Sequence, residues 1–260
     1  MLVILSPAKS LDFDSPIPTD EFTEPLNIKH SKELMDILSK YSKKDLMKLM
    51  GISEKLADLN FERNQGWTKK HTLDNSRQAI LAYDGDVYEG LQARALPLTK
   101  IKWAQSRVAI LSGLYGVLRP LDLIQPHRLE MGTKIKNPAG ADLYRYWSKV
   151  ATPQVINLVE QSSGSKVLVN LASDEYFKAL DSTEIKDAGI KIVKCIFQEL
   201  RGDIYKIISF NAKKARGLMT RFIIDNKVTK PEGMQGFDLE GYRFDAEVSD
   251  EVNFYFRRTL

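Results

Sequence analysis

The sequence of 260 residues has one cysteine and three histidines, and this scarcity limits the chemistry open to it. A single cysteine, Cys195, cannot form a disulfide within the chain, and it argues against a zinc site made of thiolates. Cys195 lies in an alternating, strand-like segment, so we expect a buried and unreactive thiol. The histidines lack the His-Glu-x-x-His spacing, so we expect no bound metal and no other cofactor.

Long apolar runs and phosphate-binding glycine motifs are also missing. No stretch approaches the roughly 18 apolar residues of a membrane span, and residues 1–7 lack the basic flank of a signal peptide. We therefore expect a cytoplasmic protein with no membrane partner. The segment Gly113–Gly116 has neither the third glycine of a dinucleotide fingerprint nor the Lys-Ser/Thr pair of a Walker loop. It is typical of a tight turn.

The composition is that of a globular domain, with 43% hydrophobic and 28% charged residues. Lysine and arginine number 38 against 34 acidic residues, which gives a net charge of +4. Residues 94–107 and residues 211–228 each carry a local charge of +4, so the remainder of the chain is −4. Clustered cations favour a polyanion partner because each phosphate contact releases counterions. The alternative is two solvated helix faces.

Strand-like and helical patterns alternate from end to end without a linker, which predicts one α/β domain over residues 1–260. We expect a mixed sheet surrounded by helices. A long helix is predicted over residues 211–228, with Asn211 as its N-cap. The predicted strands are residues 2–5, 108–112, 166–170, 190–200, 204–210, 242–246 and 252–256.

Residues 43–69 contain two helical patterns joined by the short turn Gly51-Ile52-Ser53, which resembles a helix-hairpin-helix. Such a turn directs backbone N–H groups toward a phosphate, and the positive end of the second helix adds to the attraction. Gly51 would supply the unusual backbone angles, Ile52 would anchor the turn, and Lys55 would add charge. The alternative is an ordinary helical hairpin, because Ser53 stands where a second glycine is usual and is itself a good N-cap.

Polar loops follow three predicted strands, at residues 6–12, 119–130 and 170–176. Loops at the carboxyl ends of strands commonly build the site of an α/β protein. Lysine, arginine and carboxylate groups there could bind a phosphodiester and activate water or a sugar. The alternative is a set of ion pairs and caps that fix the loops. The residues that could converge are Lys9, Asp12, Arg119, Arg128, Glu130, Asn170, Ser173 and Glu175.

Several of these segments together resemble the bacterial YaaA family of peroxide-stress-resistance proteins, over residues 1 to about 258. The matching motifs are Ser6-Pro7-Ala8-Lys9, residues 115–122 (YGVLRPLD), residues 128–132 (RLEMG), residues 170–173 (NLAS) and residues 210–217 (FNAKKARG).

The resemblance implies a cytosolic protein that protects against hydrogen peroxide and is associated with limiting free iron. It implies an unusual single α/β domain with a helix-hairpin-helix and a basic cleft, which binds double-stranded DNA. The hairpin carries over onto Gly51, Ile52 and Ser53. The cleft cations carry over onto Lys9, Arg119, Arg128, Lys213, Lys214 and Arg216.

The leading interpretation is a DNA-binding protein of the oxidative stress response that grips the duplex backbone without reading bases. The alternative is an enzyme of the N-glycosidase or lyase type that acts on damaged bases or nucleotides. In that case Asp12, Glu130 or Glu175 would activate water and Lys9 would be a nucleophile. A third possibility, an iron-binding protein, is opposed by the shortage of cysteine and histidine ligands. No protein partner is indicated.

Overall fold

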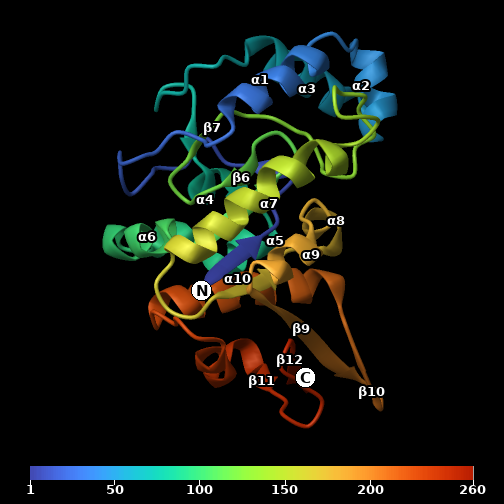
Figure 1. Ribbon diagram of the computed structural model, residues 1–260. Helices are drawn as coiled ribbons and strands as arrows, with labels where there is room; N and C mark the ends of the chain where they lie inside the picture. Colours follow the sequence, from blue (N-terminus) through green and yellow to red (C-terminus); the bar gives the residue numbers. More distant parts are fainter. Residues whose placement is uncertain (260) are drawn as a thin grey trace.

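The computed structural model describes residues 1–259 and is organised around a mixed sheet of eight strands. The strand order is β11-β12-β9-β8-β1-β5-β6, and β10 pairs with the outer part of β9 (Figure 1). The strands of this sheet are β1 (Leu2–Leu5), β5 (Val108–Ser112), β6 (Gly116–Leu118), β8 (Val167–Leu171), β9 (Lys191–Arg201), β10 (Ile204–Lys206), β11 (Arg243–Phe244) and β12 (Asn253–Arg258).

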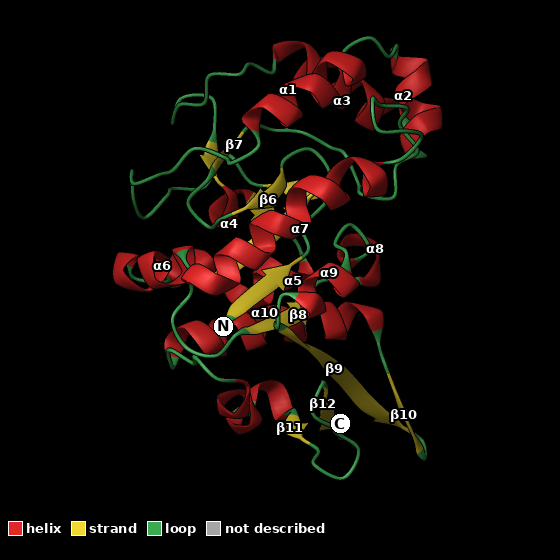
Figure 2. Ribbon diagram, in the orientation of Figure 1, coloured by secondary structure: helices red, strands yellow, loops and turns green. Residues whose placement is uncertain are grey.

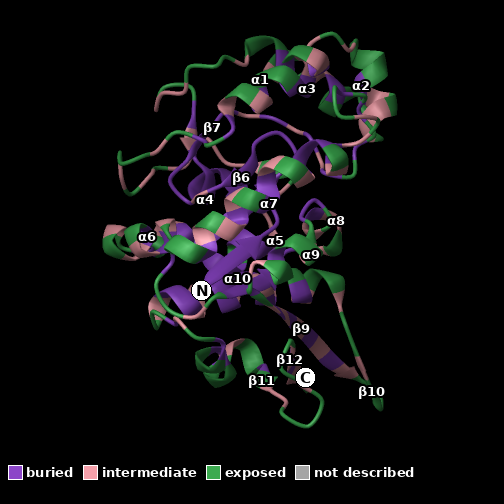
Figure 3. Ribbon diagram, in the orientation of Figure 1, coloured by how far each residue is buried: buried purple, intermediate pink, exposed green. Residues whose placement is uncertain are grey.

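The centre of the sheet is parallel, because β12, β9, β8, β1 and β5 run in one direction. Every residue of β1, β5 and β8 is buried (Figure 3), as expected for parallel strands that are covered on both faces. The outer strands β11, β6 and β10 are antiparallel to their neighbours. Two small antiparallel pairs lie outside this sheet, β2 (Ser10–Leu11) with β4 (Tyr83–Asp84) and β3 (Arg77–Gln78) with β7 (Leu123–Ile124).

Helices surround the sheet, and α1, α2 and α3 gather at one end of the molecule, away from β11 and β12 (Figure 2). No helix in the described part of the chain is long and apolar enough to cross a membrane. The α-helices are α1 (Ile28–Leu38), α2 (Lys43–Met50), α3 (Glu54–Gly66), α4 (Ala79–Ala82), α5 (Asp86–Leu91), α6 (Leu98–Gln105), α7 (Leu143–Gln161), α8 (Asp174–Phe177), α9 (Ser182–Asp187) and α10 (Ser209–Asp225). Short 3₁₀ helices are η1 (Ala93–Ala95), η2 (Pro231–Gly236) and η3 (Leu239–Gly241).

The structure confirms the α/β class, the mixed sheet and the predicted strands, but it corrects the start of α10. The N-cap of this helix is Ile208, so the prediction that Asn211 caps it is wrong. Asn211 lies inside the first turn. The strand predicted over residues 204–210 ends at Lys206, and the chain turns directly into the helix. The prediction also missed β6, β7 and α9, which are too short to carry a clear hydrophobic period.

Cys195 is a core residue, as predicted. Its side chain lies on the inner face of β9 with a residue exposure of 4%. Burial raises the pKa of the thiol to about 12. The thiolate is therefore scarce at neutral pH, and Cys195 is not a nucleophile.

Candidate functional site

The sheet has a topological switch point at β1, because β5 lies on one side of it and β8 on the other. The loops that leave such neighbouring strands diverge, and ligands of open α/β sheets bind in the crevice between them. A cavity of about 280 Å³ lies at this point, lined by residues that follow β1 and β8. We call it the strand-end pocket. In Figure 1 the arrow of β1, which starts next to the N-terminus, points toward α5.

The strand-end pocket unites several of the predicted side chains. Lys9 Nζ lies 2.8 Å from Glu130 Oε2, and Arg128 Nη2 donates to Glu130 Oε1 at 2.9 Å. Glu130 is therefore held between two cations, one from each side. The Lys9 side chain is 66% exposed, so this ion pair contributes little to stability and leaves the amine accessible. Lys9, Glu130 and Glu175, three of the residues expected to converge, all line this pocket.

Hydrogen bonds between loops fix the walls of the pocket. The Ser173 N–H donates to Ser6 Oγ at 2.8 Å, which ties the loop after β8 to the loop after β1. The Gly132 N–H donates to Glu175 Oε1 at 2.9 Å. The other carboxylate oxygen of Glu175, Oε2, takes no part in this hydrogen bond. The pocket is thus a preformed arrangement of segments that are distant in sequence.

Two cations on α10 complete the pocket, and close helix packing places them there. Lys213 and Arg216 lie one turn apart and both line the pocket. Lys213 Nζ is 3.7 Å from Asp86 Oδ2 on α5. Arg216 is half-buried, and burial lowers the pKa of its guanidinium below the ordinary value. No ion pair or hydrogen bond to the Arg216 side chain occurs within residues 1–259.

Three other predicted site residues lie outside the strand-end pocket and have structural partners. Arg119 binds the fully buried Asp122, with Nη2 at 2.8 Å from Oδ1. Asp12 accepts from Ser15 Oγ at 2.6 Å and pairs with Arg94 at 2.7 Å. Asn170 Oδ1 accepts a hydrogen bond from the Ala172 N–H at 2.9 Å.

The two basic segments that stand out in the sequence are largely neutralised in the fold. Lys100 lies 2.5 Å from Asp225, and Arg221 on α10 binds the same carboxylate at 2.7 Å. Lys214 pairs with Glu240 at 2.8 Å and Lys102 with Glu21 at 2.7 Å. Basic residues that are close together in the sequence therefore do not form a cluster of unpaired positive charge on the surface. A polyanion must find most of its cations elsewhere, since among the nine cations of these two segments only Arg107, Arg216 and Lys227 make no ion pair in the described chain.

The α2–turn–α3 unit has the geometry of a tight helical hairpin. Gly51 ends α2 with φ 62° and ψ 40°, the left-handed conformation that favours glycine. Ile52 packs half-buried against the core. Ser53 caps α3, with its Oγ accepting from the Leu56 N–H at 3.4 Å. The turn is exposed, but the N–H groups of Gly51 and Ile52 both donate to the Met47 carbonyl oxygen.

A groove of about 760 Å³ beside this unit carries lysines that the sequence reasoning missed. Lys40, Lys48 and Lys134 line it and are exposed, and none makes an ion pair within residues 1–259. We call it the lysine groove. The alternation of Lys134 and Lys136 with Thr133 and Ile135 in the sequence is a signal that could have directed Lys134 outward. Gly132 lies in the same groove and binds Glu175, so the lysine groove adjoins the strand-end pocket.

A smaller cavity of about 20 Å³ shares Lys9 and Glu130 with the strand-end pocket and extends toward His127. We call it the inner chamber. His127 is 7% exposed, and its Nδ1 donates to the Gln125 carbonyl at 2.8 Å. Burial lowers the pKa of His127 to about 4, so the ring is neutral at pH 7 and Nε2 is an acceptor. Its position in a closed chamber was not predicted.

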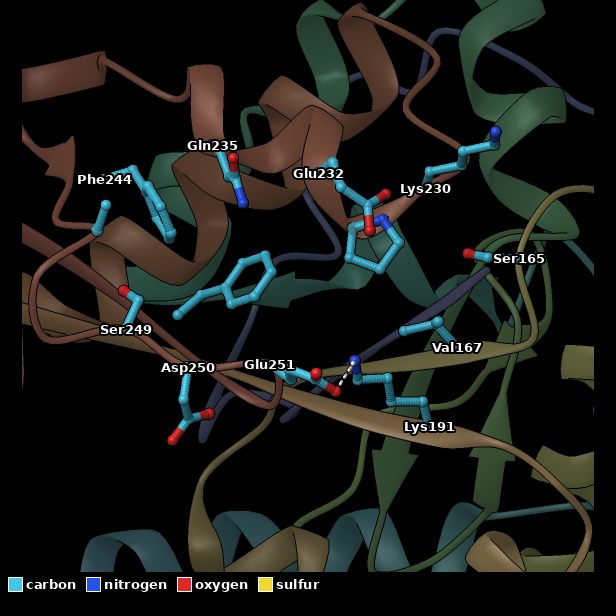
Figure 4. A pocket seen from close by; sticks show the side chains of 13 residues that line it. Ser165, Val167, Lys191, Lys230, Glu232, Gln235, Phe244, Ser249, Asp250 and Glu251 are labelled. Carbon is cyan, nitrogen blue, oxygen red and sulfur yellow. Dashed lines mark hydrogen bonds and ion pairs between the residues drawn. The ribbon is translucent and has the colours of Figure 1, made fainter.

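A hollow of about 800 Å³ lies at the opposite end of the sheet (Figure 4), near the amino-terminal ends of β8 and β9. The ion pair drawn there joins Lys191 to Glu251 at 3.2 Å, and both side chains are exposed. It lies away from the carboxyl ends of the strands, where sites of this fold class form. Among residues 1–259, no group of three or more His, Cys, Asp and Glu side chains could hold a metal ion.

Comparison with known proteins gives consistent matches along the chain. The family model described as peroxide stress protein YaaA matches residues 1–248. A UPF0246 protein of Albidiferax ferrireducens is 51% identical over 258 residues, covering 99% of this chain and 98% of the relative. UPF0246 proteins of Bordetella petrii and Bordetella avium are 50% and 47% identical over 260 residues. These two alignments cover 99% and 100% of both chains, respectively.

Proposed function

The chain belongs to the peroxide stress protein YaaA family, and we propose that it serves the oxidative stress response by binding the backbone of duplex DNA. In this proposal the Gly51-Ile52-Ser53 turn, Lys55 and the lysine groove hold the phosphates. The proposal includes the association with limited free iron that the family resemblance implies.

The observation that supports DNA binding best is the set of free lysines beside the α2–α3 turn. Lys40, Lys48 and Lys134 line one groove and make no ion pair in the described chain, although Asp45 also lines it. Lys55, just after the turn, is exposed. Phosphate contacts of this kind supply affinity without reading bases. Lys9 and Lys213 lie in the adjoining strand-end pocket, where they pair with Glu130 at 2.8 Å and Asp86 at 3.7 Å. Arg119 and Lys214 are engaged in internal ion pairs and are left out of the proposed contact surface.

The test is the salt dependence of duplex affinity, measured by fluorescence anisotropy with a random-sequence duplex of about 20 base pairs. For wild type we expect log Kd to rise steeply with log salt. The triple variant K40Q/K48Q/K134Q should bind more weakly, with the slope reduced by about 3, since each phosphate contact contributes roughly 0.9.

The matched control is K166Q/K186Q/K227Q, which removes three exposed lysines from other surfaces. Its total charge equals that of the groove variant, so a general electrostatic effect would weaken both equally. Equal loss in the two triple variants, or wild-type binding that is flat from low to physiological salt, contradicts the proposal.

A second candidate is an enzyme that acts on damaged bases or nucleotides, and the Lys9–Glu130 pair favours it. An amine nucleophile must lose a proton, and Glu130 lies 2.8 Å from Lys9 Nζ to receive it. In a lyase step the amine would add to the C1′ aldehyde of an abasic sugar and form an imine with loss of water. Lys9 lines the strand-end pocket and is 66% exposed, so such a sugar could reach its amine.

Borohydride trapping tests this candidate. A duplex with an abasic site is incubated with the protein and sodium borohydride, which reduces the imine to a stable cross-link. The cross-link should form with wild type and with K186Q but be lost in K9A. If K9A binds the duplex like wild type and no cross-link or strand cleavage occurs with wild type, the protein is a binder only.

A further inference from the structure

The guanidinium of Arg216 is half-buried, and burial is the main cause of its lowered pKa. It lines the strand-end pocket, and the side chain has no ion pair or hydrogen bond within residues 1–259. The charge of Asp174 raises the pKa of Arg216, but Asp174 is itself paired with Lys194 at 3.2 Å. Burying a charge is costly unless it has a partner. The planar fork of arginine matches a phosphate or carboxylate, and the open side of Arg216 faces the pocket.

The packing of α10 on α5 holds Arg216 in this place. A Cβ on Gly217 would lie 1.8 Å from the Val87 carbonyl oxygen, and a Cβ on Gly90 would lie 2.2 Å from the Lys214 carbonyl oxygen. The two helices therefore touch backbone to backbone at reciprocal glycines. This contact is rigid, so the guanidinium next to Gly217 is preorganised for a ligand.

The lining of the pocket also includes hydrogen-bond acceptors, the carboxylates of Glu130 and Glu175. Glu130 is charge-balanced by Lys9 and Arg128, and Glu175 has one carboxylate oxygen beyond its bond to the Gly132 N–H. Carboxylates accept hydrogen bonds from the N–H groups of a nucleobase edge. A ligand that matches both the cations and the carboxylates has an anion at one end and N–H donors at the other.

The inner chamber adds polar groups that have no partner inside the described chain. Tyr83 is 3% exposed and its hydroxyl makes no hydrogen bond, and Arg128 Nε is likewise buried without an acceptor. His127 Nε2 adds an acceptor. The volume of about 20 Å³ holds one water molecule or one exocyclic atom of a ring. Two donors and one acceptor converging on one small space are suited to the polar substituent of a base.

We propose that the strand-end pocket binds a nucleoside monophosphate, with its phosphate on Arg216 and Lys213 and its base toward Glu130 and Glu175. The pocket volume of about 280 Å³ suits one nucleotide and is too small for a dinucleotide cofactor. This inference deepens the second proposed function by naming its ligand class. It does not depend on the lysine groove.

Isothermal titration calorimetry of the full chain with the 5′-monophosphates of adenosine, guanosine, cytidine and uridine tests the proposal without DNA. At least one should bind ten-fold or more tightly than its nucleoside and than inorganic phosphate. R216Q should lose ten-fold or more of that affinity, R216K should lose less, and K186Q should match wild type. Y83F should weaken binding selectively among the bases. R216K keeps the positive charge, so it carries the test if R216Q fails to fold.

A second arm separates a free nucleotide from a nucleotide within DNA. Duplexes with and without one unpaired nucleotide are compared in wild type and R216Q. A wild-type preference for the unpaired site that R216Q loses, with paired-duplex affinity unchanged, assigns the pocket to DNA. Monophosphate binding without that preference assigns it to free nucleotides. If no monophosphate exceeds inorganic phosphate and no preference exists, or if R216Q and R216K both equal K186Q, the proposal is overturned. If wild type binds a monophosphate but does not bind duplex DNA, only the DNA-binding proposal is contradicted.

Discussion

Gly217 on α10 stands directly against the backbone of Val87 on α5, where a Cβ would come within 1.8 Å of the carbonyl oxygen. Main chain rather than a flexible side chain forms this contact, so no rotamer change can relieve it. The contact matters for function because α10 carries Lys213 and Arg216 into the strand-end pocket. A glycine in the middle of a helix is otherwise unfavourable by about 1 kcal/mol relative to alanine.

We expect Gly217→Ala to lower the free energy of unfolding by about 3 kcal/mol, because overpacking against backbone forces the helices apart. Urea unfolding followed by circular dichroism measures the change. Gly66→Ala is the matched control, since Gly66 lies in α3 and a Cβ there meets no atom within 4 Å. A Gly217→Ala variant as stable as Gly66→Ala would contradict the close helix contact.

Arg119 is expected to stabilise the fold rather than contact DNA. Removing it in Arg119→Met leaves the carboxylate of Asp122, which is 0% exposed, without its cation. We expect a loss of about 3 kcal/mol in unfolding free energy, with the duplex affinity of the folded variant unchanged. Arg243→Met is the control, because that exposed pair at 3.8 Å should contribute no more than about 1 kcal/mol. If Arg119→Met were as stable as wild type but bound DNA more weakly, Arg119 would be a DNA contact instead.

Asp12 should make stability depend on pH at the acidic end. Hydrogen bonds from Ser15, the largest cause, together with the Arg94 charge hold the pKa of Asp12 at about 2, against an ordinary 3.8. A lowered folded-state pKa contributes stability above about pH 4, and this contribution is lost as the pH falls through 2.

Asp12→Asn should therefore be about 2 kcal/mol less stable than wild type at pH 7, with the difference shrinking between pH 4 and pH 2. Chemical unfolding at a series of pH values measures the gap. Asp187→Asn, an exposed acid at the end of α9, serves as the control and should show a constant small difference. A pH-independent gap for Asp12→Asn would exclude the ion pair as its source.

The turn between α2 and α3 should tolerate side chains only at the cost of backbone strain. Gly51 has φ 62°, but a Cβ there meets no atom within 4 Å. Gly51→Ala should then cost about 1 kcal/mol, and Gly51→Asn less, because asparagine adopts the left-handed conformation more readily. Thermal unfolding measures both. If the two variants lose duplex affinity while retaining stability, the turn touches the phosphate backbone; unchanged affinity in both would separate the turn from DNA.

Local features of the sequence were enough to predict most of the fold. Unbroken apolar runs predict β1, β5 and β8 because parallel strands are buried on both faces. The glycine and serine between residues 50 and 54 predict the α2–α3 turn, since backbone angles and capping depend on neighbouring residues only. Placement of polar loops after three predicted strands led to the expectation that residues such as Lys9, Glu130 and Glu175 lie together, and these three line the strand-end pocket.

Only the tertiary structure decided which charges are free. Arg94 is neutralised by Asp12, and Lys100 by Asp225, across separations in sequence that no local pattern reveals. Conversely, Lys40, Lys48 and Lys134 are too scattered in sequence to form a basic segment, yet they line one groove. Electrostatic attraction acts over a few ångströms of space and is indifferent to chain position. The sequence therefore determined the total charge and the strand-end loops, while folding decided where positive charge stays unpaired.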